Sequence, residues 1–419
     1  MNILLPTDSF PPNCGGSGWS TYDLARGLVE RGHTVLVVKV VAGKSGAEVA
    51  THDNGIRVLE YHAYAPAVPG VRNYFKNERL YPRLAQRLEE LIDANRIDLV
   101  HGQHVLSAPP SVMAATRRGI PSVVTIRDYW PVCYKSDLIH TTGTLALCPG
   151  CSRAAGVQHD RPRLGVIGFA RTAAQTYLRR NMAQKIATVA SASAVIAVSS
   201  VIARDLLARA PELSRTRIEV IPNPVNVTAL LRAAETQRPL PDPYALYVGK
   251  LAVNKGTDHL VDVIQQADLD WPLVIVGDGP DRNAVESAAR ASACDVRFEG
   301  WLNQAETGRW IAHAGLLIFP SRGPESLSRV LLEASARGIP IAAMNTGGTA
   351  DIVEDEITGL LSDSPSGLAD DVRRLRHGEV LRQRLGAAAA KRTAEKFDSP
   401  AVISRIEALY GDVMREPRW

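Results

Sequence analysis

Short apolar runs alternate with helical patterns along the whole chain, and this alternation limits the possible folds more than any other feature. The runs are rich in Val, Ile and Leu, which is typical of strands buried on both faces of a parallel sheet. Helical stretches separate them, as crossovers between parallel strands require. The sequence therefore predicts an α/β fold of doubly wound, Rossmann-like domains. In the first half the expected strands are 3–6, 34–41, 99–101, 122–126, 194–198 and 218–221.

The second half repeats this pattern, and prolines gather between the two halves in Pro222-Asn-Pro224 and Gln237-Arg-Pro-Leu-Pro-Asp-Pro243. Prolines end regular structure, and 419 residues are more than one hydrophobic core normally serves. We therefore expect a first domain over 1–226, a linker over 227–242 and a second domain over 243–399. The expected strands of the second domain are 245–248, 273–276, 296–298, 315–319 and 339–343.

Composition is ordinary for a globular protein, with 45% apolar and 22% charged residues. The formal net charge of +4 is too small to argue for a nucleic-acid partner. The longest uncharged stretch, 186–203, contains several serines and is a poor membrane span. Because Met1-Asn-Ile-Leu-Leu5 is typical of a first strand and not of a secretory leader, we expect a cytoplasmic protein.

Two carboxylates, Glu325 and Glu333, stand eight residues apart shortly after the expected strand 315–319. If a helix begins near Ser326, Glu325 lies at its cap and Glu333 about two turns further on. The N–H groups of Leu327 and Ser328 would then lack helical partners and face an anion. A ligand with both phosphate and hydroxyl groups fits this pattern. The alternative is a capping Glu followed by a solvated helix Glu.

The residues around this pair resemble the donor-site signature of family 4 retaining glycosyltransferases, which have the GT-B fold. The signature covers Pro320-Ser-Arg-Gly-Pro324, Glu325-x7-Glu333, Ala334-Ser-Ala-Arg-Gly-Ile-Pro-Ile341 and Gly347-Gly348. The resemblance spans nearly the whole chain, and several motifs in this order are hard to obtain by chance. It implies two Rossmann-like domains facing across a cleft, with the C-terminal helix 400–419 completing the first. The further matching segments are Tyr247-Val-Gly-Lys-Leu251, Lys255-Gly256, Val274-Ile-Val-Gly-Asp-Gly-Pro280, Phe298-Glu-Gly-Trp-Leu302 and Ile221-Pro-Asn-Pro-Val225.

The resemblance also implies roles for individual residues on the donor side. It assigns Glu333 to the nucleotide ribose and Glu325 to the donor sugar, and the lysines Lys250 and Lys255 suit a diphosphate. The family usually has Arg where Lys250 stands, so the phosphate geometry would be looser. As the alternative, both lysines are solvated loop residues. The remaining expected nucleotide-sugar contacts are Gly15, Gly16, Gly249, Gly277, Trp301, Leu302, Leu327 and Ser328.

We therefore expect a metal-independent retaining glycosyltransferase that uses a nucleotide sugar, most simply a UDP-sugar, and needs no cofactor. Its acceptor would be a sugar, a lipid-linked compound or a small molecule. Two alternatives remain open: a hydrolase or epimerase of nucleotide sugars on the same fold, and a nucleotide-sugar-binding protein without turnover.

The acceptor side departs from the family pattern, because Arg127 stands where many members have His. A fixed positive charge there suits an anionic acceptor, a sugar carboxylate or the diphosphate, whereas the alternative is a simple pair with Asp128. The loop Asp98-Leu-Val-His-Gly-Gln-His104 resembles the family's second acceptor-side loop and places His101, Gln103 or His104 near the cleft. The alternative is a histidine with a purely structural role.

Two further segments have open interpretations. Cys133, Cys148 and Cys151 lie in an insert with His140 and His159, and we expect reduced thiols in a lid, with structural zinc as the less favoured alternative. A basic segment over 161–185 would bind an anionic membrane surface peripherally, or it is a solvated helix face. Its basic residues are Arg161, Arg163, Arg171, Arg179, Arg180 and Lys185.

Overall fold

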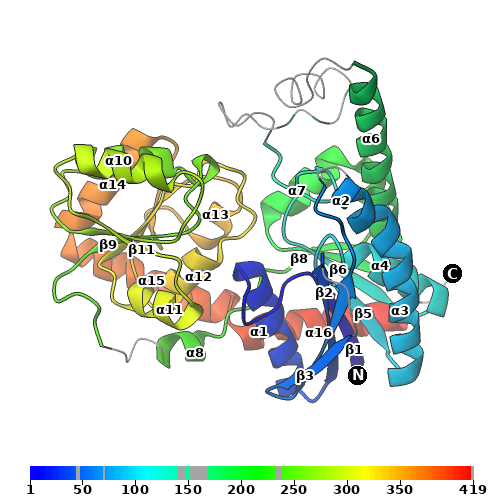
Figure 1. Cartoon of the computed structure of the whole chain (residues 1–419). Helices are drawn as coiled ribbons and strands as arrows, with labels where there is room; N and C mark the ends of the chain where they lie inside the picture. Colours follow the sequence, from blue (N-terminus) through cyan, green and yellow to red (C-terminus); the bar gives the residue numbers. More distant parts are fainter. Residues whose placement is uncertain are drawn as a thin grey trace. The chain divides into compact units, whose positions relative to one another are not determined.

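The computed structural model describes residues 1–43, 48–68, 71–139, 148, 150, 168–232 and 237–416; for 168–175 it describes the backbone only. The chain divides into two compact units (Figure 1). The first contains the described residues up to Pro224 and the segment from Ser399 onwards. The second contains Val225–Asp398, so it is an insertion within the first.

The first unit contains an eight-stranded sheet in the order β3-β4-β2-β1-β5-β6-β7-β8. All neighbouring pairs are parallel except β3 and β4, which form an antiparallel hairpin. Asn54 and Gly55 join this hairpin, and both have positive φ, as the favoured two-residue hairpin turn requires. The strands are β1 (Asn2–Thr7), β2 (Thr34–Ala42), β3 (Val49–Asp53), β4 (Ile56–Ala63), β5 (Leu99–Gly102), β6 (Ser122–Ile126), β7 (Ala194–Ala197) and β8 (Ile218–Val220).

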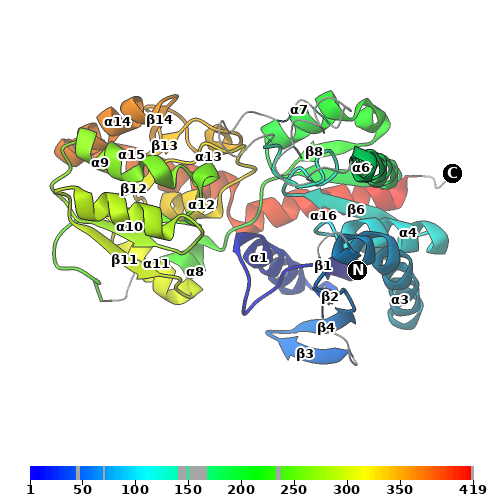
Figure 2. The same ribbon diagram turned by 45° about the horizontal axis from the view of Figure 1, so that its top comes forward.

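Helices cover both faces of this sheet, because alternate side chains of each strand point to opposite faces. Ile3 and Leu5 of β1 pack into the core formed with α1 and α16, whereas Leu4 packs into the core formed with α3 and α4. Figure 2 shows α1 and α16 side by side. The helices of this unit are α1 (Gly16–Glu30), α2 (Val71–Tyr74), a π-helix (Phe75–Arg79), α3 (Leu80–Asn95), α4 (Ala108–Arg118), α6 (Gly168–Ala190), α7 (Ser200–Arg209), a 3₁₀ turn (Pro211–Arg215) and α16 (Ser399–Arg415).

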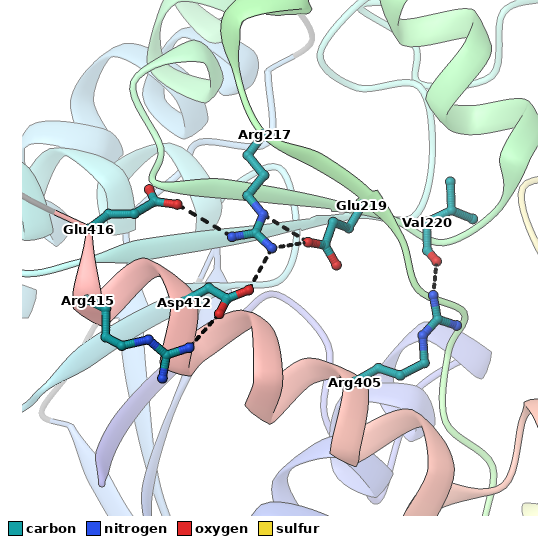
Figure 3. A network of polar contacts seen from close by, with 7 residues as sticks. All are labelled: Arg217, Glu219, Val220, Arg405, Asp412, Arg415 and Glu416. Atoms are coloured by element: carbon teal, nitrogen blue, oxygen red, sulfur yellow. Dashed lines mark hydrogen bonds and ion pairs between the residues drawn. The ribbon is translucent and has the colours of Figure 1, made fainter.

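The C-terminal helix α16 is tied to the first unit by buried apolar residues and by a polar network at its end. Arg217, just before β8, donates to Glu219 and to Asp412 of α16 at 2.8 Å, and Arg405 donates to the Val220 carbonyl at 2.6 Å (Figure 3). The buried apolar residues of α16 are Val402, Ile403, Ile406, Leu409, Tyr410 and Val413.

The second unit contains a six-stranded parallel sheet in the order β11-β10-β9-β12-β13-β14. Its strands are β9 (Ala245–Val248), β10 (Leu273–Val276), β11 (Val296–Gly300), β12 (Leu316–Phe319), β13 (Ile341–Met344) and β14 (Leu360–Ser362). Its helices are α8 (Val227–Arg232), α9 (Leu260–Gln266), α10 (Arg282–Ala291), α11 (Gln304–Ala312), α12 (Arg329–Ala336), α13 (Thr349–Ile352), α14 (Pro365–His377) and α15 (Glu379–Lys396), with 3₁₀ turns at Val253–Lys255 and Thr257–His259.

The fold class agrees with the sequence prediction: both units are parallel α/β sheets, and every strand expected from the sequence is present within about two residues. Three strands were not expected, namely β3, β4 and β14. The range 227–242, expected to be a linker, begins with helix α8. Over the residues described, no helix is both long and apolar enough to cross a bilayer.

Candidate active site

Lys255 and Glu325 meet in the second unit, beyond the carboxyl ends of the neighbouring strands β9 and β12. Lys255 Nζ lies 2.5 Å from Glu325 Oε1, and the Ser321 hydroxyl donates to the same oxygen. The Glu325 side chain is only 10% exposed. The carboxylate is thus held in one orientation by two donors, at the edge of a parallel sheet where ligands usually bind.

The backbone around Glu325 is fixed by a close approach of Gly347. Gly347 has φ of +53°, and a Cβ there would lie 2.1 Å from the Glu325 carbonyl oxygen. The next residue, Gly348, donates its N–H to that oxygen at 2.7 Å. Only glycine fits at 347, which explains why Gly347-Gly348 accompanies the carboxylate in the sequence.

Glu333 lies on α12, is 8% exposed and accepts a 2.8 Å bond from Nε of Arg329. The sequence prediction was wrong about where this helix begins: Ser328 is its N-cap and Arg329 its first residue. Leu327 therefore precedes the helix, and the N–H groups without helical partners begin at the cap. Glu333 is one turn from the helix start, and one carboxylate oxygen is already engaged by Arg329.

The other expected donor-side residues lie in loops of the same unit. Lys250 is exposed, and its carbonyl accepts from the Tyr247 hydroxyl at 2.9 Å. The backbones of Gly249 and Gly277 lie in close contact. A Cβ on Gly277, where φ is +141°, would lie only 1.9 Å from the Gly249 carbonyl oxygen. Trp301 is 67% exposed after β11, and Leu302 is half-buried. Trp301 thus presents an open aromatic face.

The glycine segment of the first unit forms a helix start and not a free loop. Gly15 is the N-cap of α1 and Gly16 its first residue. Trp19 donates its N–H to the Gly15 carbonyl. Gly15 and Gly16 therefore lie in the first turn, where N–H groups lack helical partners.

Arg127 follows β6 and is 7% exposed. It donates from Nε to Asn223 Oδ1 at 2.8 Å and from Nη1 to the Gln103 carbonyl at 3.1 Å. No ion pair between Arg127 and Asp128 is found within 4.0 Å, although Asp128 lies near enough to raise the arginine pKa slightly. Burial dominates and lowers the pKa of Arg127 to about 9. The partners of this guanidinium are therefore neutral oxygens.

His101 has a structural role, which is the alternative that the sequence left open. Its ring is fully buried, and its nitrogens contact the Tyr410 hydroxyl and Thr125 Oγ1, each at 2.6 Å. Burial lowers its pKa well below the usual value. His101 thus joins β5 to β6 and α16 as a neutral imidazole.

Two carboxyl groups at this edge of the first sheet were missed as site candidates. Asp8 directly follows β1, and Asp128 follows Arg127 after β6. Burial raises the pKa of each to about 6. The position of Asp8 after the first strand of a doubly wound sheet was the signal that could have identified it.

The cysteine-containing insert and the basic segment, each of which has two interpretations, lie partly outside the described residues. Cys133 is buried and Cys148 half-buried, while Cys151, His140 and His159 lie outside. Within the described ranges no three His, Cys, Asp or Glu side chains are grouped as a metal site.

In the basic segment, Arg161 and Arg163 also lie outside the described residues, as does the side chain of Arg171. Arg179 and Arg180 are exposed, but Lys185 is only 3% exposed and its Nζ lies 5.5 Å from the centre of the Tyr134 ring. Lys185 therefore does not belong to an outward basic face.

Family models match both units. A model described as Glycosyltransferase Family 4 matches residues 14–229, which is 216 of the 419 residues, and one described as glycosyl transferases group 1 matches residues 242–377. Among relatives, a D-inositol 3-phosphate glycosyltransferase from Xylanimonas cellulosilytica is 27% identical over 410 residues, covering 92% of this chain and 88% of the relative. A glycogen synthase from Mycobacterium tuberculosis is 27% identical over 444 residues, covering 100% and 97%.

Solved structures show the same architecture. Sucrose-phosphate synthase from Thermosynechococcus elongatus matches with a TM-score of 0.70 at 19% identity, over 98% of each chain. Anabaena HepE in complex with UDP-glucose matches with a TM-score of 0.68 at 17% identity, over 98% of this chain and all of the other. These likenesses show the GT-B fold. Together with the family match, they establish that this chain belongs to glycosyltransferase family 4 and is a glycosyltransferase with the GT-B fold.

Proposed function

We propose that this protein is a metal-independent retaining glycosyltransferase that transfers a sugar from a UDP-sugar to a hydroxyl-bearing acceptor. The family membership supports the reaction class. Structures of fold relatives contain UDP, UDP with glucose and UDP-glucose, which supports the choice of donor. The observation that carries the proposal is the Lys255–Glu325 pair, which lies in the same unit as the carboxylate of Glu333 on α12.

The donor would lie along these groups. Glu333 accepts hydrogen bonds from the ribose hydroxyls, and Glu325 accepts from the donor sugar. Lys250, Lys255 and the N–H groups at the start of α12 face the diphosphate. Further contacts to the nucleotide sugar are proposed for Gly15, Gly16, Gly249, Gly277, Trp301, Leu302, Leu327 and Ser328.

In the proposed reaction, the bond between the anomeric carbon and the β-phosphate oxygen breaks, and a bond to the acceptor oxygen forms on the same face. The acceptor proton passes to the leaving diphosphate, so no protein base is required. Negative charge develops on that diphosphate, and the lysines and helix N–H groups stabilise it. A divalent metal or cofactor is not needed for this role. Arg127 supplies a fixed charge on the acceptor side.

Nucleotide binding tests the donor site. The purified protein should be stabilised against heat by UDP and UDP-glucose more than by ADP or GDP, with no change after addition of EDTA. Glu333→Gln should weaken UDP binding by about 10- to 100-fold, the usual loss for a hydrogen bond to a charged group. The control Glu395→Gln changes an exposed carboxylate on α15 and should leave binding unchanged.

A second control separates the ribose contact from the ion pair inside α12. Arg329→Met breaks the same pair but keeps the carboxylate, so it should retain most of the UDP affinity. Equal losses in Arg329→Met and Glu333→Gln would show that Glu333 acts only through helix stability. Proton NMR of the product should show the donor's anomeric configuration, and an inverted product would refute the retaining mechanism.

The two relatives are named for chemically different compounds. One full-length relative is named for inositol 3-phosphate, which carries negative charge, and the other is named for glycogen, which is neutral.

A further inference from the structure

The Lys255–Glu325 pair joins two loops at the carboxyl edge of the second sheet. We call 252–259, which follows β9, the lysine loop, and 320–325, which follows β12, the glutamate loop. The lysine loop contains two 3₁₀ turns, and 320–325 contains no helix or strand. Side chains on such loops keep a fixed geometry only if supporting contacts hold the loops in place. The position of the pair therefore depends on contacts between the two loops.

Backbone contacts tie the loops together just before Lys255. The Asn254 carbonyl accepts from the N–H groups of Arg322 and Gly323 at 3.1 and 2.8 Å. The approach is close, since a Cβ on Gly323 would lie only 3.1 Å from the same carbonyl oxygen. The glutamate loop is thus bound to the residue that precedes Lys255.

A side-chain contact ties the loops together again just after Lys255. Arg322 donates from Nη1 to His259 Nε2 at 2.8 Å and from Nη2 to Asp258 Oδ2 at 2.5 Å. Because an arginine is always a donor, His259 Nε2 is the acceptor and carries no proton. Arg322 therefore binds the lysine loop on both sides of Lys255, with its N–H on one side and its guanidinium on the other.

The Arg322 guanidinium is engaged by protein groups and is not an open cation. Two of its nitrogens bind the lysine loop, and Nε is shielded from solvent. The Arg322 side chain is 25% exposed and that of Asp258 is 36% exposed. An ion pair exposed to this degree adds little to stability, because water and salt screen it. Its effect therefore lies in the arrangement of the two loops.

We propose that Arg322 is a positioning residue, which fixes the lysine loop against the glutamate loop and so holds Glu325 toward the donor sugar. The inference rests on the proposed function, in which Glu325 accepts hydrogen bonds from that sugar. Glu325 lies three residues after Arg322, and its carboxylate is 2.5 Å from Lys255 Nζ. A shift between the loops would move the two partners of this pair relative to each other. Arg322 acts through Glu325 and needs no contact with the ligand.

A double-mutant cycle on the binding of UDP-glucose, measured by isothermal titration calorimetry, tests this role. Glu325→Gln should weaken binding by about tenfold or more, the usual loss for a hydrogen bond to a charged group. Arg322→Met should weaken it by about threefold or more, because a displaced carboxylate keeps only part of that bond. The double variant should bind about as weakly as Glu325→Gln alone. Additive losses would overturn the proposal, and so would an unchanged affinity in Arg322→Met.

A direct contact between Arg322 and the donor would also weaken binding in Arg322→Met, and Asp258→Ala separates the two cases. This variant removes a partner of the guanidinium but leaves the guanidinium itself in place. If Arg322 positions the loops, Asp258→Ala should weaken the binding of UDP-glucose by about twofold or more. Equal or tighter binding would show that Arg322 contacts the donor itself. Since Asp258 is partly exposed, this variant also decides the matter if Arg322→Met fails to fold.

Arg376→Met is the matched control for the loss of a bridging arginine. The Arg376 side chain is 23% exposed and donates to Asp270 Oδ2 at 2.6 Å, near the amino end of β10 in the same unit. It should leave the affinity for UDP-glucose unchanged. Equal losses in Arg322→Met and Arg376→Met would show a general effect on the unit and overturn the proposal.

The same titrations separate this inference from the proposed function. Failure of the unaltered protein to bind UDP-glucose would refute the proposed function. An unchanged affinity in Glu325→Gln would refute the role of Glu325, on which both depend. Binding that is weakened by Glu325→Gln but not by Arg322→Met or Asp258→Ala would refute the positioning role of Arg322 alone.

Discussion

At the scale of single residues, the Asp8 carboxyl lies where ionisation is costly. Burial, with a smaller effect from the Asp128 charge, raises its pKa from 3.8 to about 6, against hydrogen bonds from Leu106 and Ser107 that lower it. Because the folded pKa exceeds the unfolded one, Asp8 favours folding below about pH 4, and this contribution is lost as the pH rises through about 6. Near neutral pH, Asp8 therefore reduces the stability of the fold.

Asp8→Asn should raise the free energy of unfolding near pH 7, because the amide carries no charge to bury. A shift of about two pKa units corresponds to at most about 3 kcal/mol. The gain should vanish below about pH 4, where the unaltered carboxyl is protonated. Thermal unfolding followed by circular dichroism across this range would measure it, with Asp242→Asn as the exposed control. If the difference in unfolding free energy between Asp8→Asn and the unaltered protein did not change with pH, ionisation of Asp8 would not be its cause.

How far the site could be predicted depends on how close its contacting residues lie in the sequence. The acidic pair and the lysines stand out in the sequence, because their motif is local. His101 and Arg127 could not be placed, since Tyr410 lies 309 positions from His101 and Asn223 lies 96 from Arg127. A single sequence does not show such distant contacts.

At the scale of elements, α16 is joined to the sheet by a buried hydrogen bond. The Tyr410 hydroxyl lies 2.6 Å from His101 Nδ1, and both side chains are fully buried. Tyr410→Phe keeps the ring but leaves the imidazole nitrogen without a partner. We expect a loss of about 1–3 kcal/mol in urea unfolding. The partly exposed Arg217 network near the end of α16 provides the contrast.

Arg217→Gln removes several ionic contacts but should cost less than Tyr410→Phe, because solvent and salt screen exposed charges. Its effect should also shrink at high salt, whereas the effect of Tyr410→Phe should not. If Arg217→Gln proved the more harmful, the ionic network and not the buried bond would hold this helix.

Element boundaries were harder to predict than element types. The helix α12 begins three residues later than expected, because the tight turn in which Glu325 donates its N–H to the Gly323 carbonyl delays it. The hairpin of β3 and β4 was missed although Asn54-Gly55 is a strong turn signal, because β3 is exposed throughout and shows no apolar run. Periodicity identifies buried strands and overlooks exposed ones.

At the scale of the whole molecule, the fold class was predictable because two sheets with alternating helices leave a repeated pattern. The place of α16 in the first unit was expected only through the family resemblance, since its apolar face alone does not indicate which surface it covers. Val225 pairs with Asp398, and its N–H donates to the Phe397 carbonyl at 3.0 Å. The chain thus enters and leaves the second unit at adjacent points.

This adjacency leads to a prediction for isolated fragments. Residues 1–226 alone should not fold cooperatively, because they lack α16, which contributes six buried apolar side chains to the core that it shares with α1. At about 1.5–3 kcal/mol for each large side chain, the loss is on the order of 10 kcal/mol, comparable to the stability of a whole domain. The fragment should show no cooperative transition in thermal unfolding followed by circular dichroism.

Fusing residues 399–416 to residue 226 through a short Gly/Ser linker should restore a cooperative transition, because the two points lie side by side in the native chain. The matched control carries Leu409→Asp in the fused helix, which places a charge in the core and should abolish the rescue. Cooperative unfolding of 1–226 without the helix would show that α16 only decorates a complete domain. Failure of the fused chain to fold would show that the first unit needs the second as well.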